Sequence, residues 1–414
     1  MEQKNNEYLI GTGVRDITPA IGVPLVGGVA PYISDGIATR LYVKALALAS
    51  SEEPEEKVLF ITLDNLKYPE ADKARDRLSK STGLERSRIL VTASHAHSCP
   101  WYEDYGESLV EAMEQAAADA LASMECCGLY MIRKDAPGIS QNRRVLLDGV
   151  CWNTWLFPRE DREKYTPAAE HDISVQALAA KRPDGSVKAV IFNFACHACN
   201  SGLTPTLISA DYPGYVRLKL DERLGYHTET LFFPGACGDV NGTKTAEVVG
   251  NRLGEIIADS LPEAEPVPAG PVRIGSEIIG TEDRQVADFK SEEVAKTWED
   301  QVEHFRQGFE EAVNARKEQY LLEVDLVDIA GHTAIITCPV ELFTEIGMEI
   351  KKESPFAYTI AAEQTNGAYG YVPTKKGFTQ GGYETFYGEH SFLKEDAGEK
   401  IFEASERLLN EYKK

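Results

Sequence analysis

Hydrophobic residues recur along the chain in short runs that alternate with amphipathic segments. The runs at 41–49, 58–64 and 88–93 are nearly continuous in apolar residues, which is typical of strands buried on both faces. Residues 71–82 and 107–124 are predicted to be helices, and the second is rich in Ala, Glu and Leu. This alternation predicts an α/β fold of layered, mixed β-sheets flanked by helices.

The rest of the chain continues the pattern with weaker signals. Two strands are expected to pair as a hairpin across Arg182-Pro-Asp-Gly. Residues 141–144 are predicted to lie in a loop, and Cys126-Cys127 to form the buried end of a helix. We see no internal repeat and no linker, so a single catalytic domain over residues 1–414, without a C-terminal β domain, is expected. The further predicted strands are 8–14, 173–179, 188–195, 229–234, 334–340 and 358–362, and the further helices are 212–224, 291–318, one after Glu341 and one from about Leu393.

Composition narrows the class of protein. The chain has 43 Lys and Arg against 66 Asp and Glu, a formal charge of −23. Such a surface repels a polyanionic backbone, so we expect no nucleic-acid partner and interpret the charge as a source of solubility. The start of the chain is polar, and no apolar stretch is long enough to cross a bilayer. A cytoplasmic protein with reduced cysteines and no stable membrane association is therefore predicted.

Polar residues follow several of the predicted strands. Asp64, His95, His197, Asp239 and Glu341 each stand at or just beyond the end of an apolar run. Ligands of open α/β sheets gather where strands end. These side chains are therefore expected to converge on one site, with the motif Ser94-His95-Ala96-His97-Ser98, which also supplies His97, as its centre.

His95 and His97 are two residues apart, so on extended chain they point to the same side. Two imidazoles can then share a cation, or one can bind it while the other meets the substrate. Ser94 and Ser98 are expected to orient the ring N–H groups. The alternative is that one or both histidines are structural.

His197 lies between Cys196 and Cys199, but a closed structural zinc site needs four ligands and no second cysteine pair has suitable spacing. We therefore expect both cysteines to be buried small residues and His197 to be the ligand. Glu341 is either the cap of the following helix or a ligand. Three neutral imidazoles and a carboxylate suit zinc acting as a Lewis acid on bound water, with iron and manganese left open.

These segments, in their order along the chain, resemble the neutral ceramidase family. The resemblance extends from about residue 9 to residue 390. The matching segments are Gly11-Thr-Gly-Val-Arg-Asp-Ile-Thr-Pro, Ser94-His-Ala-His-Ser, Asn193-Phe-Ala-Cys-His, Gly238-Asp-Val, Val340-Glu-Leu-Phe, Tyr371-Val-Pro-Thr and Gly381-Gly-Tyr. The resemblance implies the catalytic-domain fold of that family and one zinc ion held by His95, His197, Glu341 and Tyr371.

It also implies roles for the neighbouring side chains. His97 would contact the substrate or the attacking water, and Tyr383 would stabilise the tetrahedral oxyanion. Asp239 would orient a group near the water. Arg143 would line the substrate entrance, with Asn241 beside the substrate.

Two departures from the family shape the predicted reaction. Family members carry Ser-Pro where this chain has Asn241-Gly242, and an Asn cannot act as a hydroxyl nucleophile. The chain is also shorter than the ceramidases. We therefore predict a zinc-dependent amidohydrolase that uses metal-activated water on a soluble N-acyl amide, a small molecule such as an acyl amino acid, an acyl amino sugar or a short N-acyl amine.

Three alternatives stay open at this point. A TIM-barrel metal hydrolase also carries His-x-His at a strand end, but after its first strand. An esterase or lactonase would use the same centre on a different bond. A non-catalytic, metal-stabilised binding protein is suggested by the replacement of Ser by Asn241.

Overall fold

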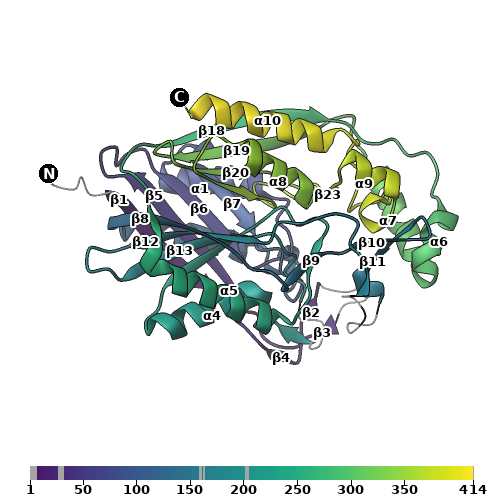
Figure 1. Cartoon of the computed structure of the whole chain (residues 1–414), viewed down its shortest axis with the longest axis horizontal. Coiled ribbons are helices and arrows are strands. Elements are labelled where there is room, and N and C mark those ends of the chain that lie inside the picture. Colours follow the sequence, from purple (N-terminus) through teal and green to yellow (C-terminus); the bar gives the residue numbers. More distant parts are fainter. Residues whose placement is uncertain (1–6, 27–31, 158–160, 162–163, 201–204, 414) are drawn as a thin grey trace.

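Two β-sheets packed face to face form the centre of the molecule, and helices cover both outer faces (Figure 1). The computed structural model describes residues 7–26, 32–157, 161, 164–200 and 205–413. The result is a four-layer arrangement of helix, sheet, sheet and helix, which confirms the predicted layered α/β class. The strands lie in open, mixed sheets, so the TIM-barrel alternative is wrong.

The larger sheet has nine strands in the order β15-β13-β12-β8-β1-β5-β6-β7, with β17 paired to β8. Neighbours are antiparallel except β13 with β15 and β6 with β7, which are parallel. The strands are β1 (Glu7–Asp16), β5 (Tyr42–Ser50), β6 (Val58–Leu63), β7 (Ile89–Ala93), β8 (Glu125–Asp135), β12 (Ser174–Lys181), β13 (Val187–Phe194), β15 (Glu229–Pro234) and β17 (Glu265–Pro266).

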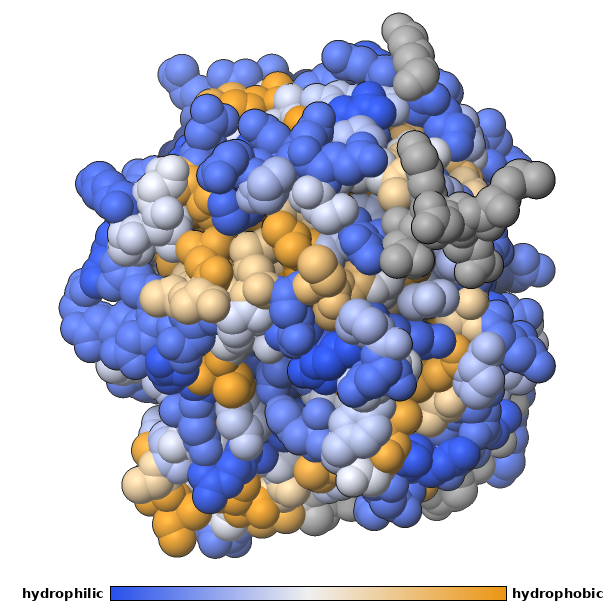
Figure 2. Space-filling model, turned by 90° about the vertical axis from the view of Figure 1, so that its left-hand side faces the viewer, coloured by the Kyte–Doolittle hydropathy of each residue, from blue (hydrophilic) through white to orange (hydrophobic). Residues whose placement is uncertain are grey.

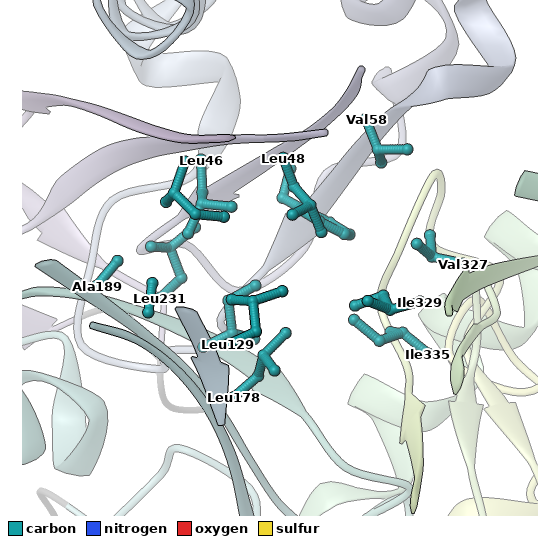
Figure 3. Packing of buried hydrophobic residues seen from close by; sticks show 14 of the residues in the cluster. Leu46, Leu48, Val58, Leu129, Leu178, Ala189, Leu231, Val327, Ile329 and Ile335 are labelled. Carbon is teal, nitrogen blue, oxygen red and sulfur yellow. The ribbon is translucent and has the colours of Figure 1, made fainter. Parts of the chain in front are cut away.

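The second sheet has the order β18-β19-β20-β22 and faces the larger one. Its strands are β18 (Val272–Thr281), β19 (Tyr320–Ile329), β20 (Thr333–Thr337) and β22 (Tyr358–Ala362). Figure 3 shows the core between the sheets, where Leu46 and Leu129 of the larger sheet lie in one cluster with Val327 and Ile335 of the second. This shared core fixes the distance between the two sheets.

Helices bury the outer faces. Alternate residues of β5 point to different layers: Leu46 enters the core between the sheets, whereas Ala45 packs under α1 and α3. Burial on both faces explains why this strand is nearly continuous in apolar residues. A Cβ at Gly11 would lie 1.8 Å from the Ala120 carbonyl oxygen, so glycine lets α3 rest directly on β1. The covering helices are α1 (Ala71–Thr82), α3 (Glu107–Ala122), α4 (Asp211–Leu224) and α5 (Ala246–Ser260) on the larger sheet, and α8 (Thr344–Glu353) and α10 (Ala397–Tyr412) on the second.

Shorter elements connect these layers, and most of them surround the ends of the strands on the right-hand side of Figure 1. They are β2 (Pro24–Leu25), β3 (Tyr32–Ile33), β4 (Gly36–Ile37), α2 (Tyr102–Tyr105), β9 (Ser140–Asn142), β10 (Arg144–Leu147), β11 (Val150–Asn153), β14 (Leu207–Ile208), β16 (Val240–Gly242), α6 (Ser291–Trp298), α7 (Val302–Ala315), β21 (Glu341–Leu342), β23 (Tyr371–Val372) and α9 (Lys375–Gln380).

Two local predictions are wrong. Cys126-Cys127 lies in β8, not at a helix end, because Leu9 and Tyr8 of β1 pair with these cysteines; Cys127 is buried and Cys126 exposed. Residues 141–144 enter two short strands, β9 and β10, on either side of Arg143. The helical segment predicted over residues 291–318 is confirmed as two helices, α6 and α7, joined by a 3-10 turn and ending at Ala315. The predicted hairpin is confirmed as β12 and β13.

Figure 2 shows one face of the molecule, covered mainly by hydrophilic side chains with smaller hydrophobic patches between them. This agrees with the excess of acidic residues. Within the described part of the chain, none of the helices combines the length and the apolar character needed to cross a bilayer.

Candidate metal centre

Three histidines from two strand ends meet at one point. His95 and His97 follow β7, and His197 follows β13. The three rings offer nitrogen atoms that all lie within 4.8 Å of one another. The ring centroids of His95 and His197 are 4.5 Å apart, and those of His95 and His97 are 5.0 Å apart. This spacing is short enough for the three imidazoles to surround one ion.

Backbone carbonyl groups orient two of these rings. The Nδ1 of His95 lies 2.9 Å from the Leu66 carbonyl oxygen, and the Nδ1 of His197 lies 2.8 Å from that of Cys237. With Nδ1 held in this way, the Nε2 atom of each ring is directed into the centre. The serine prediction is wrong for Ser94, whose side chain lines a separate small cavity beside Asp64 and Lys44.

His95 has a φ of 60°, in the left-handed region that non-glycine residues rarely adopt. The hydrogen bond from Ala96 N–H to the Asn65 carbonyl holds the chain on the far side of this turn. Strained backbone of this kind is concentrated at functional sites.

Glu341 completes the ring of ligating atoms. Its Oε2 is 3.3 Å from the His95 Nε2 and 3.4 Å from the His197 Nε2. Glu341 begins β21, and its partner in the parallel strand β23 is Tyr371, whose hydroxyl oxygen is 3.4 Å from the same His197 Nε2. The four predicted ligands are therefore together, and His97 lies beside them.

The centre has buried polar atoms that form no hydrogen bond with the residues the structure describes. His95, His197 and Glu341 are at most 9% exposed. The Nε2 atoms of His95 and His97 and the Oε2 of Glu341 are buried and lack a hydrogen-bond partner among the described residues. Buried polar groups are almost always paired, so these atoms indicate a ligand. A divalent cation fits this set of nitrogen and oxygen donors.

Burial and charge favour the ligating forms of His97, His197 and Glu341, whereas burial lowers the pKa of His95 but the Glu341 carboxylate outweighs it and raises that pKa. Burial, with the neighbouring His95 and His197, holds the pKa of His97 well below its usual range. Burial and the Arg143 guanidinium lower the pKa of His197 to about 3. Burial opposes the charge of Glu341, but His95 outweighs it and holds the pKa of this carboxyl well below its ordinary value. Neutral imidazoles and an ionised carboxylate are the forms that bind metal.

Arg143 reaches the centre from the short segment between β9 and β10. Its Nη1 donates to the His197 Nε2 at 3.0 Å and to the Asn241 Oδ1 at 3.2 Å. Its Nε donates to Glu384, which also accepts from Arg144. A metal ion on His197 would replace the first of these hydrogen bonds, because the same nitrogen lone pair serves both.

Asp239 supports this segment from behind. Its carboxylate accepts from the Asn142 side-chain amide at 2.6 Å and from the Thr344 N–H at 2.8 Å. Its carbonyl oxygen accepts from the Arg143 N–H. Burial raises the pKa of Asp239 to about 6. The preceding Gly238 leaves no space for a side chain, since a Cβ there would lie 2.6 Å from the Glu341 carbonyl oxygen.

Tyr383 lies at the partly exposed side of the centre, in a set of aromatic rings. It stacks on His390 at 4.9 Å between centroids, and its ring centroid is 5.5 Å from that of Trp155 and 5.6 Å from that of Tyr371. The Arg143 guanidinium lies over Trp155 at 4.6 Å. The side of the centre next to Tyr383 is therefore aromatic and cationic.

Not every strand-end residue joins the centre. Asp64 accepts a hydrogen bond from the Tyr42 N–H and lies with Lys44 and Arg217 at a different cavity. Two buried carboxylates were missed by the sequence reasoning. Glu363 follows strand β22, so the rule that found Glu341 would have found it; for Glu384 the sequence holds no comparable signal.

The fold and this site define a four-layer α/β protein with a His-His-His-Glu centre at its strand ends. The sequence model of the family "Neutral/alkaline non-lysosomal ceramidase, N-terminal" matches residues 8–258, and the chain belongs to this family. Membership of this family indicates that the protein is a hydrolase that acts on a carbon–nitrogen amide bond. No curated protein matches the sequence significantly.

Two solved structures share the fold. The crystal structure of neutral ceramidase from Pseudomonas aeruginosa is 15% identical, with a TM-score of 0.74, and the match covers 98% of this chain and 75% of that one. A ceramidase complexed with C2 is 14% identical, with a TM-score of 0.72, and the match again covers 98% of this chain and 75% of the other. These matches confirm the predicted ceramidase-like fold.

Proposed function

We propose that this protein is a zinc-dependent amidohydrolase that cleaves N-acyl amides with metal-activated water. The observation that carries the proposal is a set of buried ligating atoms on His95, His97 and Glu341 that form no hydrogen bond with any described residue and lie within a few ångströms of His197. The family match supports the amide bond as the target.

His95, His197, Glu341 and Tyr371 would hold one zinc ion. When bound, zinc supplies Lewis-acid activation of water and of the substrate carbonyl. The protein's own contribution is to orient the ligands: carbonyl groups fix the tautomers of His95 and His197, and strand pairing fixes Glu341 opposite Tyr371.

His97 is the proposed proton carrier. Its Nε2 is buried and has no hydrogen-bond partner among the described residues, and His97 is half-buried whereas His95 and His197 are buried. It accepts a proton from the attacking water and returns it to the leaving amine at the same nitrogen. The Tyr383 hydroxyl donates a hydrogen bond to the oxyanion that forms as the carbonyl carbon becomes tetrahedral.

Arg143 and Asn241 would bind the substrate, and Asp239 would position Arg143. Arg143 and Asn241 hydrogen-bond to each other beside His197 and would contact the polar group next to the scissile amide. Asp239 would act through its contacts with Asn142 and the Arg143 backbone, which set the place of the guanidinium.

The substrate we propose is a soluble N-acyl amide. The aromatic and cationic side of the centre, with Trp155, Tyr383 and Arg143, supports a compact molecule with a polar group. The family name points to ceramide, a lipid with the same amide bond. Values of kcat/KM for N-acyl amino acids, N-acetyl amino sugars and short-chain N-acyl sphingoid bases would decide between them; a preference for the sphingoid amides would contradict the soluble substrate.

The metal centre is tested with His95→Ala and Glu341→Ala. Both variants should lose zinc, measured by elemental analysis, and amidase turnover with it. Unchanged zinc occupancy in both variants would contradict the ligand assignment.

A second candidate function is supported by Asn241, which stands where the family carries Ser. On this view the protein is a metal-stabilised binding protein without catalysis. Metal-dependent hydrolysis of any amide, ester or lactone in a broad panel would exclude it, and a preference for esters or lactones would redefine the bond cleaved. The cytoplasmic location predicted from the sequence is tested by cell fractionation.

A further inference from the structure

The segment of residues 363–366, directly after β22, is bonded to the chain beside two of the proposed ligands. Its Glu363 N–H donates to the Pro234 carbonyl, and its Gln364 N–H donates to that of Val340. The Gln364 carbonyl accepts from the Ala93 N–H, two residues before His95. Backbone bonds therefore tie this one segment to the chain leading to His95, to the chain leading to Glu341 and to the end of β15.

The Glu363 side chain adds a second set of bonds. Its Oε2 accepts from the Cys237 N–H at 3.0 Å and from the Leu342 N–H at 2.9 Å, while its Oε1 accepts from the Cys237 thiol at 3.0 Å. The residue is 0% exposed. A single carboxylate therefore bridges the turn 235–239 and strand β21.

Both bridged residues are one step away from a proposed ligand. The Cys237 carbonyl oxygen is the acceptor that orients the Nδ1 of His197. Leu342 directly follows Glu341. Movement of the Glu363 carboxylate would therefore shift the His197 ring and the Glu341 carboxylate relative to each other.

Packing alone does not account for a glutamate at this position. Burying a carboxyl group is costly, as the burial that raises the pKa of Glu363 to about 8 reflects, and an apolar residue of similar size would avoid that cost. Among the described residues no Lys or Arg forms an ion pair with Glu363; its partners are two N–H groups and a thiol. The backbone of the same segment is strained, with φ values of 54° at Gln364 and 61° at Asn366.

We propose that Glu363 is a positioning residue that sets the spacing of His197 and Glu341 and thereby the affinity of the centre for zinc. It does not touch the substrate. This inference rests on the zinc centre proposed above.

The test compares Glu363→Ala and Glu363→Gln with Asp328→Asn. Asp328, in β19, is a matched control: it is also a carboxylate with 0% exposure, but it accepts from the Gly331 N–H of the following turn and lies next to Arg273. The dissociation constant for Zn²⁺ is measured on metal-free protein by competition with a chromogenic chelator. Unfolding of each metal-free variant in urea is measured in parallel.

Glu363→Ala should weaken zinc binding by about 10- to 100-fold, the usual effect of losing a group that orients a ligand. Glu363→Gln keeps an oxygen for the two N–H groups and should weaken it less. Asp328→Asn should bind zinc like the wild type even where it unfolds at lower urea. Wild-type affinity in Glu363→Gln and Glu363→Ala, or an equal loss in Asp328→Asn, would overturn the proposal.

Two further outcomes are distinguishable. If Glu363→Ala does not fold, Glu363→Gln alone decides, because it preserves shape and volume. If the wild type itself fails to bind zinc, the zinc centre is wrong; if the wild type binds and the Glu363 variants bind equally, only the positioning role is wrong.

Discussion

Two buried polar clusters lie side by side in this protein, and they differ in how well their atoms are satisfied. In the histidine centre, His95, His97 and Glu341 each present a buried ligating atom that has no hydrogen-bond partner within the described part of the chain. In the neighbouring cluster, Glu384 accepts from Arg143, Arg144 and the Asn153 amide. Arg144 also donates to the carbonyl groups of Gly377 and Gly381.

This difference indicates that the histidine centre is a site that can receive a ligand (the receptive site), whereas the Glu384 cluster holds neighbouring side chains in place (the supporting cluster). Unpartnered buried ligating atoms are costly unless a ligand arrives, whereas both oxygens of the Glu384 carboxylate are bonded and hold their partners rigidly. Among the described residues, the Arg143 Nη2 and the Asn153 Oδ1 of that cluster also lack a hydrogen-bond partner, but neither belongs to a proposed ligand. The hydrogen bond from Arg143 Nη1 to His197 Nε2 joins the two. Variants on either side of this bond should therefore fail in different ways.

The largest effect is expected for His197→Ala. Removing this ring takes away a proposed ligand and the acceptor of Arg143, so zinc content and amidase activity should both fall to background. Elemental analysis and turnover measure this. Glu384→Gln is the control, because its folded fraction should keep zinc. Full zinc occupancy in His197→Ala would show that the histidine belongs with the supporting cluster instead.

His97→Asn should lose activity but keep the metal. His97 lies beside the four proposed ligands, so kcat is expected to fall by about 100- to 10,000-fold, the range for a lost general acid–base, with zinc still bound. Single-turnover rates and zinc content measured on the same sample decide the matter. Loss of zinc in this variant would show instead that His97 is itself a metal ligand.

Glu384→Gln should chiefly lower stability. The carboxylate is fully buried between two guanidinium groups, and breaking such a pair costs about 3–5 kcal/mol. Urea unfolding of the metal-free protein measures the loss. Glu277→Gln is the matched control, since its ion pair with Arg407 is on the surface and is worth about 0–1 kcal/mol. Equal losses in the two variants would deny the supporting role.

The smallest effect is expected at His227, an exposed histidine with both nitrogens bonded. Glu229 first and Asp221 second raise its pKa to about 9 in the folded state. The added stability should therefore be complete below about pH 6.5, the unfolded pKa, and vanish as pH rises through 9. His227→Gln should lower the free energy of unfolding by under about 1 kcal/mol at pH 6. A difference from the wild type that persists at pH 10 would contradict this.

The sequence predicted the layers well, because burial on two faces leaves a plain signature. Strands such as β5 and β6 are apolar at nearly every position and were found with accurate limits. The strand-end rule also placed His95, His197 and Glu341 together, since it depends only on where apolar runs stop.

Contacts between distant segments were not predictable in the same way. Cys126-Cys127 continues a helical composition, and only its pairing with β1 makes it strand. Asp64 also follows an apolar strand, but its side chain does not reach the histidine centre. It lies with Lys44 and Arg217 at another cavity. The Leu66 carbonyl orients the His95 ring only because the His95 backbone is left-handed, and no local sequence motif predicts that conformation.

The order in which the ligands occur along the chain has a consequence for synthesis. His95 and His197 belong to the larger sheet, whose last strand ends at Pro266, whereas Glu341 and Tyr371 follow with the second sheet. At usual translation rates, roughly ten seconds or more separate the emergence of His197 from that of Tyr371. A nascent chain would thus display two of the proposed ligating imidazoles without Glu341, and tight binding of the proposed metal ion would have to wait until the final third has been made. Maturation of the enzyme is in this sense a late event of translation.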